Sequence, residues 1–387
     1  QDAMFPDETL LSFKPDIVFI HTTNRNVTDW PEMTDTTEQI DEKLHTEINR
    51  FTAMWKSIAE KFHCPIIQNN FEMPLYRLLG SRDAWDIHGR TNFLTRLNEA
   101  FYAYARENES FYIHDLNFVS ADYGLKEWSN PLFWNMYKYA MCFEAIPSFA
   151  FSVSHIIKSI FGKNKKALAL DLDNTLWGGV VGDDGVDGIE IGQETGVSQS
   201  YYEFQTYVKQ LKSLGIVLTV CSKDDHENAI AGLNHPEGAL RPDDFVIIKA
   251  NWENKDRNIA ETAAELNILP DSIVFADDNP AEREIVRTQI KGAAVPDMDG
   301  VENYITTIDR SGFFEVTTFS EDDLKRNEMY KKNALRAAEM ASFGDYNDYL
   351  KSLEMHAVID DFIPVYLARI TQLTNKSNQF NVTTRRY

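Results

Sequence analysis

Two short stretches of the sequence end apolar runs in pairs of acids. In ALALDLDNT, Asp171 and Asp173 directly follow residues that read as a buried strand, and in SIVFADD a second run ends in Asp277 and Asp278. Both runs are nearly continuous in apolar residues, which is typical of central strands in a parallel sheet. Because ligands bind at the carboxyl ends of such strands, we expect the four acids to converge on one site.

Carboxylates that converge repel one another, by about 4 kcal/mol for a pair about 4 Å apart at an effective dielectric constant of about 20. Such a cluster must lose its charge by protonation or be balanced by a cation. Oxygen ligands of this kind suit Mg²⁺, which accepts few protein carboxylates and keeps several waters. The acids therefore indicate a magnesium site.

Two further polar residues are placed for phosphate chemistry. Ser222 ends the apolar run GIVLTVCS and offers a hydroxyl to a phosphate oxygen, and Lys255 offers a positive charge at the start of a predicted helix. Phosphoryl transfer requires a nucleophile in line with the phosphorus, a metal ion and donors for the equatorial oxygens. The acids, the serine and the lysine together indicate this reaction.

Each of these signals also has a structural explanation. D-x-D is common in solvated turns, Ser222 alone would be an ordinary turn or cap residue, and Lys255 alone would be a solvated helix charge. Lys223 and Lys249 compete with Lys255 for the phosphate-binding role, and we expect Cys221 to be a small core residue rather than a nucleophile. The order of the motifs, each where a strand ends or just beyond, favours the catalytic interpretation.

Alternating strands and helices would position these residues. Apolar runs predict strands over residues 166–172, 215–222, 244–250, 272–278 and 292–297. Ser200 and Glu203 have the spacing of a capping box and predict a helix that Gly215 ends. Two more helices are predicted, over 254–266 and from Asn279 onward, where Pro280 and Glu282 follow as start signals. This alternation predicts an α/β domain.

The first part of the chain alternates in the same way. Strands are predicted over 16–22, 64–70 and 111–117, and helices over 38–62, over 91–107 and in a stretch ending near Phe161. The order predicts a βαβαβ unit with a parallel sheet. The polar, basic residues 162–166 read as a linker. Beyond residue 300 we predict a charged helix over 321–341, a strand over 355–361 and an amphipathic stretch over 363–373.

The composition narrows the classes of function. With 387 residues and 43% hydrophobic content, the chain can bury the cores of two or three domains. Its 38 Lys and Arg against 60 Asp and Glu give a net charge of −22, which opposes binding to nucleic acid. The apolar stretches are far shorter than the roughly 20 residues that span a bilayer, so we expect no membrane contact. Three cysteines without metal-ligand spacing suit a reducing cytoplasm.

The motifs DLDNT, VCSKDD, WENKDRN and FADDNPAE resemble those of the haloacid dehalogenase (HAD) superfamily of aspartyl-phosphate phosphatases and phosphotransferases. The longer stretches DLDNTLWGGVVGDDG and DDNPAERE, and the closing LTNKSNQFNVTTRRY, more specifically resemble the FkbH-like family. The resemblance implies an α/β fold: a Rossmann-like HAD parallel sheet, preceded by a second α/β domain of flavodoxin or SGNH-hydrolase type. The short gaps between the motifs leave no room for a large cap.

The resemblance also implies a division of the chain into three parts. These are an SGNH-like α/β domain (1–162), a HAD-like phosphatase domain (163–310), and a helical extension with the truncated start of an acetyltransferase-like domain (311–387). Because the chain starts at Gln1 and ends in a polar stretch, we expect it to be a piece of a longer protein. The first part lacks G-D-S and D-x-x-H motifs, and Asn24 and Asp115 are at most relics of them, so we do not expect hydrolase activity there.

Carried onto this sequence, the resemblance implies that Asp171 is the nucleophile and Asp173 the acid/base. Asp171, the main-chain carbonyl of Asp173 and Asp277 would hold Mg²⁺, with Asp278 nearby. The phosphate-binding residues would be Ser222 and Lys255.

The main expectation is thus a Mg²⁺-dependent phosphatase or phosphotransferase acting on a phosphorylated substrate. The FkbH-like resemblance adds a glyceryl transferase or phosphatase that loads a phosphorylated three-carbon unit onto an acyl carrier protein. Such a partner could dock on the basic residues of the helix near 321–341, which are Lys325, Arg326, Lys331, Lys332 and Arg336.

Two non-enzymatic alternatives use similar residues. A phosphoacceptor of the response-regulator type places an acid pair on its first strand and a single acceptor aspartate on its third. Here D-x-D comes first and D-D last, which argues against that type. A scaffold with a decayed site is the other alternative, and the intact set of site residues argues against it.

Overall fold

The computed structural model describes residues 4–342 and 346–376. The chain divides into two compact units between Ile157 and Lys158, which we call the N-terminal and C-terminal units. Within the described residues, no helix combines the length and apolar character that crossing a membrane requires. Residues 377–387, which end the stretch assigned to an acetyltransferase-like domain, lie outside the described part, and the predicted domain types stay predictions.

The N-terminal unit contains a parallel sheet of three strands in the order β1-β2-β3. The strands are β1 (Val18–Ile20), β2 (Ile66–Asn69) and β3 (Phe111–His114). Helices α2 (Thr37–Phe62) and α3 (Arg90–Glu107) connect them, as parallel neighbours require. The predicted βαβαβ order is confirmed.

Aromatic packing holds α2 and α3 to this sheet. Thr36 and Gln39 form a capping box at the start of α2, and the residues that α2 buries recur at helical spacing. Among them is Trp55. Its ring centre lies 4.7 Å from the ring centre of Phe101 on α3 and 4.6 Å from that of Phe111 on β3. The remaining elements of the unit are α1 (Glu8–Phe13), η1 (Asn24–Asn26), η2 (Gly80–Ala84), α4 (Leu116–Tyr123), α5 (Leu125–Trp128), α6 (Pro131–Tyr137), η3 (Phe143–Ala145) and α7 (Ile146–Ile160), which runs past the boundary.

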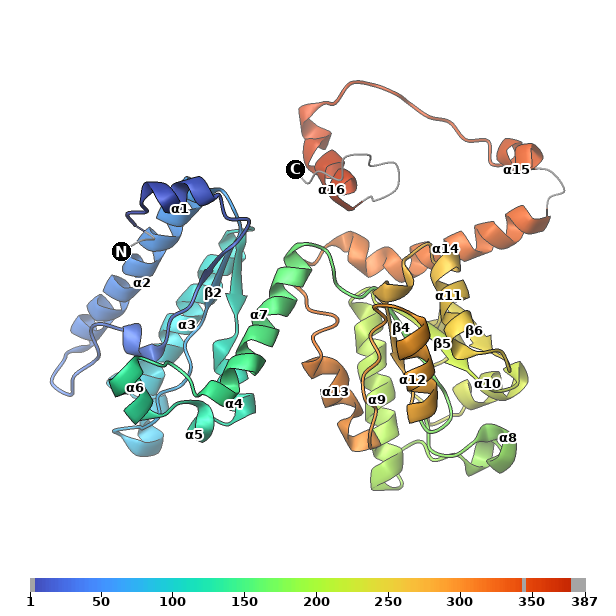
Figure 1. The fold of residues 1–387 in the computed structure, drawn as a ribbon, viewed down its shortest axis with the longest axis horizontal. Coiled ribbons are helices and arrows are strands. Elements are labelled where there is room, and N and C mark those ends of the chain that lie inside the picture. The colour runs from blue at the N-terminus through green and yellow to red at the C-terminus, as the bar shows by residue number, and fades with distance from the viewer. Residues whose placement is uncertain (1–3, 343–345, 377–387) are drawn as a thin grey trace. The chain divides into compact units, whose positions relative to one another are not determined.

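The C-terminal unit is built on a parallel sheet of four strands in the order β6-β5-β4-β7. The strands are β4 (Ala167–Leu170), β5 (Val217–Ser222), β6 (Ile247–Ala250) and β7 (Ile273–Ala276). Every residue of β4, β5 and β7 is buried, as their continuous apolar runs predict. In Figure 1, helices α9 (Gly196–Ser213), α10 (His226–Leu233), α11 (Lys255–Glu265) and α12 (Pro280–Gln289) surround the strands labelled β4, β5 and β6.

Alternate residues of β4 pack into different cores. Leu168 and Leu170 belong to the cluster that contains Phe204 of α9. Ala167 and Ala169 belong to the cluster that contains Ile259 of α11 and Val286 of α12. Because successive side chains of a strand point to opposite faces, helices cover the sheet on both sides, which is the doubly wound arrangement.

The connections between the site motifs are short. From β4 to α9 they contain α8 (Val181–Asp184) and η4 (Val186–Gly188), and from β5 to α11 they contain α10, η5 (Pro242–Asp244) and β6. In this fully described stretch there is no large cap, as predicted. The other elements are η6 (Pro270–Ser272), η7 (Val301–Asn303), α13 (Tyr304–Arg310), α14 (Glu321–Ser342), α15 (Tyr346–Ser352), η8 (Pro364–Tyr366) and α16 (Leu367–Lys376).

Three local predictions are wrong. Helix α9 is capped by Thr195, whose hydroxyl accepts from Ser198 N, whereas Ser200 lies inside the helix and donates to the carbonyl of Gly196. Residues 292–297 form a single bridge at Ala294 rather than a strand, since Pro296 cannot donate to a ladder. Residues 355–361 form no strand, because their apolar alternation meets no partner edge.

Candidate active site

Three neighbouring strands bring the predicted site residues to one edge of the sheet. Asp171 follows β4, Ser222 is the last residue of β5, and Asp277 follows β7. The ladder between β4 and β7 continues to the acid, because Asp171 N donates to the carbonyl of Ala276 at 3.0 Å. Lys255, the first residue of α11, reaches the same edge from the connection after β6.

Lys255 bridges two of the acids. Its Nζ donates to Asp171 Oδ1 at 2.8 Å and to Asp277 Oδ2 at 2.6 Å. Lys255 is 3% exposed and Asp277 is fully buried, so none of these charges is well solvated. Burial alone would lower the pKa of Lys255, but the charges of the two carboxylates raise it. Burial and the charge of Asp171 raise the pKa of Asp277 to about 6, although Lys255 opposes the shift.

Asp173 has a different environment from the other three acids. Its Oδ1 accepts from Trp177 Nε1 at 2.8 Å and from Val181 N at 3.2 Å. These bonds fix the carboxyl group through one oxygen, and Asp173 Oδ2 takes no hydrogen bond from the described residues. Burial raises the pKa of Asp173 above its usual value, as do, to a lesser degree, the charges of Asp224 and Asp171. A carboxyl group held this way can carry a proton on Oδ2.

Asp171, Asp277 and Asp278 form the one three-residue group of potential metal ligands found among the described residues. Each offers a carboxylate oxygen, and these oxygens all lie within 4.8 Å of one another. The donors are oxygen atoms from carboxylates, which suits Mg²⁺. The carboxylate of Asp173 is not in this group, although Asp173 lines the same hollow as Asp171 and Asp278. The predicted metal contact of Asp173 through its main-chain carbonyl stays a prediction.

Backbone contacts that the sequence analysis missed hold the acidic loops. Asn174 has a left-handed backbone (φ +57°), and its carbonyl accepts hydrogen bonds from the hydroxyls of Tyr201 and Tyr304 at 3.3 and 3.1 Å. Thr175 Oγ1 accepts from Asp278 N at 3.1 Å. Asparagine tolerates the left-handed region, so the order D-x-D-N-T carried a signal for this turn.

On the other loop, the guanidinium group of Arg283 donates to the carbonyls of Asp277 and Asp278 at 3.0 and 2.7 Å. This arginine is buried on α12, and a charged residue on a predicted helix gives no such signal.

The site opens as a small hollow of about 200 Å³. It is lined by Asp171, Asp173, Asn174, Ser222, Lys223, Lys255, Asp278, Asn279 and Glu282. A phosphate group fits such a volume, whereas a drug-sized ligand needs roughly 300 to 1,000 Å³. The bulk of a larger substrate would therefore lie outside it.

The two competing lysines have carboxylate partners of their own. Lys223 lines the hollow but pairs with Glu282 at 2.6 Å, and Lys249 pairs with Glu261 and Glu265. Lys255 is the lysine that contacts the acids at the strand ends. Cys221 is buried, and burial raises its pKa to about 12, which confirms it as a core residue.

The two residues considered as relics in the N-terminal unit lie on separate elements. Asn24 begins η1, and Asp115 caps α4, accepting from Phe118 N at 3.1 Å and from Asn70 Nδ2 at 2.7 Å. The contacts of Asp115 are those of a structural cap.

A scan of protein-family models finds no match to the chain. No curated protein matches it either. Among solved structures, the chain is similar to the N-terminal part of the protein BF1531 from Bacteroides fragilis, which contains a phosphatase domain and was crystallised in complex with Mg. The two are 31% identical with a TM-score of 0.75, and the similarity covers 82% of this chain and 84% of that one.

Proposed function

Because this chain belongs to the same family as the phosphatase-domain protein BF1531, we propose that it is a Mg²⁺-dependent phosphatase of the HAD type that acts through an aspartyl-phosphate. Its Rossmann-like sheet without a large cap fits that fold. The observation that carries the proposal is the buried ammonium group of Lys255 between Asp171 and Asp277 at the ends of two parallel strands. A scaffold has no need of charges buried in this way, since they are costly to desolvate.

The residues that would hold Mg²⁺ are Asp171, Asp277 and Asp278, with the main-chain carbonyl of Asp173 as the resemblance implies. When bound, the ion supplies positive charge that offsets these acids and the phosphate. The described contacts fit this role, because Lys255 already supplies one positive charge to a group that needs more than one.

Asp171 is the proposed nucleophile. Its Oδ1 accepts from Lys255, and its Oδ2 takes no hydrogen bond from the described residues, so Oδ2 is free to attack phosphorus. A bond forms between Asp171 Oδ2 and phosphorus while the bond from phosphorus to the substrate oxygen breaks. Asp173, with its raised pKa, gives its proton to the departing oxygen.

The second step returns the enzyme to its starting state. Asp173, now ionised, takes a proton from water, and the water oxygen attacks the phosphorus of the aspartyl-phosphate. The bond to Asp171 breaks and inorganic phosphate leaves. Ser222 and Lys255, which line the hollow, are the proposed donors to the phosphate oxygens in both steps.

The carrier-protein alternative rests on the basic residues of α14. Two of the basic residues expected to dock such a partner are engaged within the C-terminal unit. Arg326 pairs with Asp323 and donates to the carbonyl of Gly215, and Lys331 donates to the carbonyl of Asp243.

Hydrolysis of p-nitrophenyl phosphate, measured with Mg²⁺ and with EDTA, tests the proposal. We expect hydrolysis that needs Mg²⁺ and that falls by roughly 10³-fold or more in Asp171→Asn. Asp173→Asn should lose about 10² to 10⁴-fold, the usual contribution of a general acid. Asp183→Asn, an exposed acid on α8, is the matched control and should keep full activity. Activity that persists in EDTA or in Asp171→Asn would refute the proposal.

A further inference from the structure

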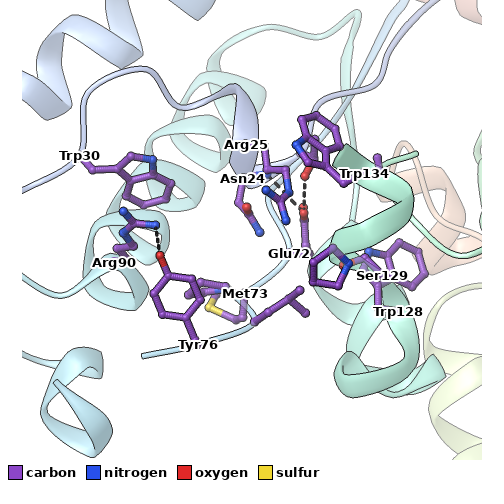
Figure 2. Close-up of a pocket in the computed structure, with 15 residues that line it drawn as sticks. Asn24, Arg25, Trp30, Glu72, Met73, Tyr76, Arg90, Trp128, Ser129 and Trp134 are labelled. Carbon is purple, nitrogen blue, oxygen red and sulfur yellow. Dashed lines mark hydrogen bonds between the residues drawn. The ribbon is translucent and has the colours of Figure 1, made fainter. Parts of the chain in front are cut away.

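A second and larger hollow lies in the N-terminal unit. It measures about 460 Å³, within the range of small-molecule sites. Its lining comes from η1, from the segment after β2, from the start of α3 and from the region of α5 and α6, so it opens at the carboxyl edge of the sheet β1-β2-β3. Ligands of open parallel sheets bind at that edge. Figure 2 shows this hollow.

Glu72 is the buried carboxyl group of this hollow. It is 4% exposed, and its Oε1 accepts from Thr23 Oγ1 at 2.5 Å and from Asn24 N at 3.3 Å. Its Oε2 is buried without a hydrogen bond from any described residue. Buried carboxylate oxygens are nearly always satisfied, because leaving one without a donor is costly. When Glu72 is ionised, its Oε2 therefore needs a donor that the described residues do not supply.

Two arginines line the same hollow, each stacked on an aromatic ring. The guanidinium carbon of Arg25 lies 4.9 Å from the ring centre of Trp134, and that of Arg90 lies 4.9 Å from Trp30 and 5.5 Å from Tyr76. In Figure 2, Arg90 lies with Trp30 and Tyr76 on one side of the hollow, and Arg25 lies with Glu72 and Trp134 toward the other.

Neither arginine forms an ion pair with a carboxylate among the described residues. In a chain with a net charge of −22, two such guanidinium groups in one hollow make a local site for an anion. Stacking also fixes the plane of each guanidinium group, so that its N–H groups can bind a carboxylate or phosphate in two-point fashion.

We propose that this hollow binds a small molecule that carries an anionic group for Arg90 on one side of the hollow and an amine for Glu72 Oε2 on the other, where Arg25 also lies (Figure 2). The aromatic side chains Trp30, Tyr76 and Trp134 enclose the carbon skeleton between the two ends. The site is separate from the phosphatase site, and the inference does not depend on the proposed function. Carboxylate and phosphate are the two forms that the anionic group can take.

Two probes with the same amine distinguish these forms. β-Alanine carries a carboxylate and O-phosphoethanolamine a phosphate, and binding of each to the full chain can be measured by calorimetry and ligand-observed NMR. We expect at least one of them to bind. Ethanolamine lacks the anion, and propionate and ethyl phosphate lack the amine, so each should bind at least roughly tenfold more weakly than the matching probe.

Substitutions in the hollow assign the binding to it. Glu72→Gln keeps the shape of the side chain without its charge, and Arg90→Gln removes one guanidinium group. Each should weaken binding roughly tenfold or more. Arg77→Gln removes the same charge from an exposed residue outside the hollow and should bind as the unmodified chain does.

Far-ultraviolet circular dichroism and denaturant unfolding followed by tryptophan fluorescence check that each variant is folded. Arg90→Gln keeps the test valid if Glu72→Gln does not fold. The proposal is overturned if neither probe binds the unmodified chain. It is also overturned if Glu72→Gln and Arg90→Gln are folded and bind the probes as tightly as the unmodified chain does. That result would mean that water satisfies Glu72 Oε2.

Discussion

At the scale of single residues, Lys255 decides whether the phosphatase site can exist without a bound ion. It neutralises one of the two charges on Asp171 and Asp277, which lie at the ends of adjacent strands. Removing one partner of a buried ion pair destabilises a protein far more than forming the pair stabilises it. The reason is that the remaining charge stays buried without a partner.

Lys255→Met should therefore destabilise the metal-free protein by about 3 to 5 kcal/mol. Lys249→Met removes the ion pairs to Glu261 and Glu265, whose side chains are about half exposed, and should cost about 1 kcal/mol or less. Denaturant unfolding in EDTA measures both costs, and added Mg²⁺ should reduce the cost of Lys255→Met because it supplies the missing positive charge. Equal costs for the two variants would show that Lys255 does not balance the acids.

Glu72 gives a second prediction, on the pH dependence of stability. Burial raises its pKa from 4.5 to about 7, although the hydrogen bonds from Thr23 and Asn24 oppose the shift. An acid whose pKa is raised on folding contributes stability below its unfolded pKa, and that contribution is lost as the pH rises through the folded value.

Between about pH 5.5 and pH 8.5, the unmodified chain should therefore lose about 2 kcal/mol of stability relative to Glu72→Gln. Denaturant unfolding followed by tryptophan fluorescence measures this difference, since Trp30, Trp55, Trp85, Trp128 and Trp134 all lie in the N-terminal unit. Parallel pH profiles for the two proteins would mean that Glu72 keeps an ordinary pKa.

The sequence predicted which residues gather at the phosphatase site but not how they are held. Asp171, Ser222 and Asp277 could be found because their types stand at the ends of apolar runs, and Lys255 because it stands at the start of a predicted helix. The position of the Asp173 carboxyl group could not, because it depends on Trp177, an apolar residue in the sequence pattern. The hollow around Glu72 was missed because its lining residues come from segments far apart in the sequence.

At the scale of elements, turns and docked helices depend on contacts that periodicity does not encode. Gly215 was predicted to end a helix, and it does so with φ +86° between α9 and β5. It also has a tertiary role, because α14 packs there. Asn327 of α14 donates to the carbonyls of Lys212 and Ile216 at 3.1 and 3.2 Å.

Gly215→Ala should destabilise the C-terminal unit by more than Gly185→Ala does. Both glycines have positive φ, which costs an alanine about 1 kcal/mol. A Cβ at Gly215 would also lie 2.3 Å from the carbonyl oxygen of Asp323 on α14, whereas a Cβ at Gly185 meets nothing within 4 Å. Thermal unfolding measures both costs, and equal values would indicate that α14 does not pack on this turn.

Strands and long helices were the elements that the sequence predicted best. The runs that became β4, β5 and β7 are buried on both faces, so their composition alone identifies them. The predicted start of α9 is too late because Thr195 and Ser200 are both acceptable caps. Burial of Ser198 and Tyr201 in the first two turns favours Thr195.

At the scale of the whole molecule, each unit has a hollow at the carboxyl edge of a parallel sheet, but the charged residues that line the two hollows differ. The hollow of the C-terminal unit gathers acids around one lysine and suits a cation together with a phosphate. The hollow of the N-terminal unit sets two arginines around one glutamate and suits an anion together with an amine. Both arrangements follow from the same topology, and the residues after each strand decide the chemistry.

If Asp171 is the nucleophile, it becomes phosphorylated during turnover, and the position of the phosphoryl group in the quenched protein identifies it. The chain is exposed briefly to p-nitrophenyl phosphate with Mg²⁺, quenched in acid to preserve an acyl phosphate, digested and analysed by mass spectrometry. We predict the phosphoryl group on Asp171, no label in Asp171→Asn, and unchanged labelling in Asp183→Asn. A label on Asp173, or turnover without any labelled aspartate, would rule out Asp171 as the nucleophile.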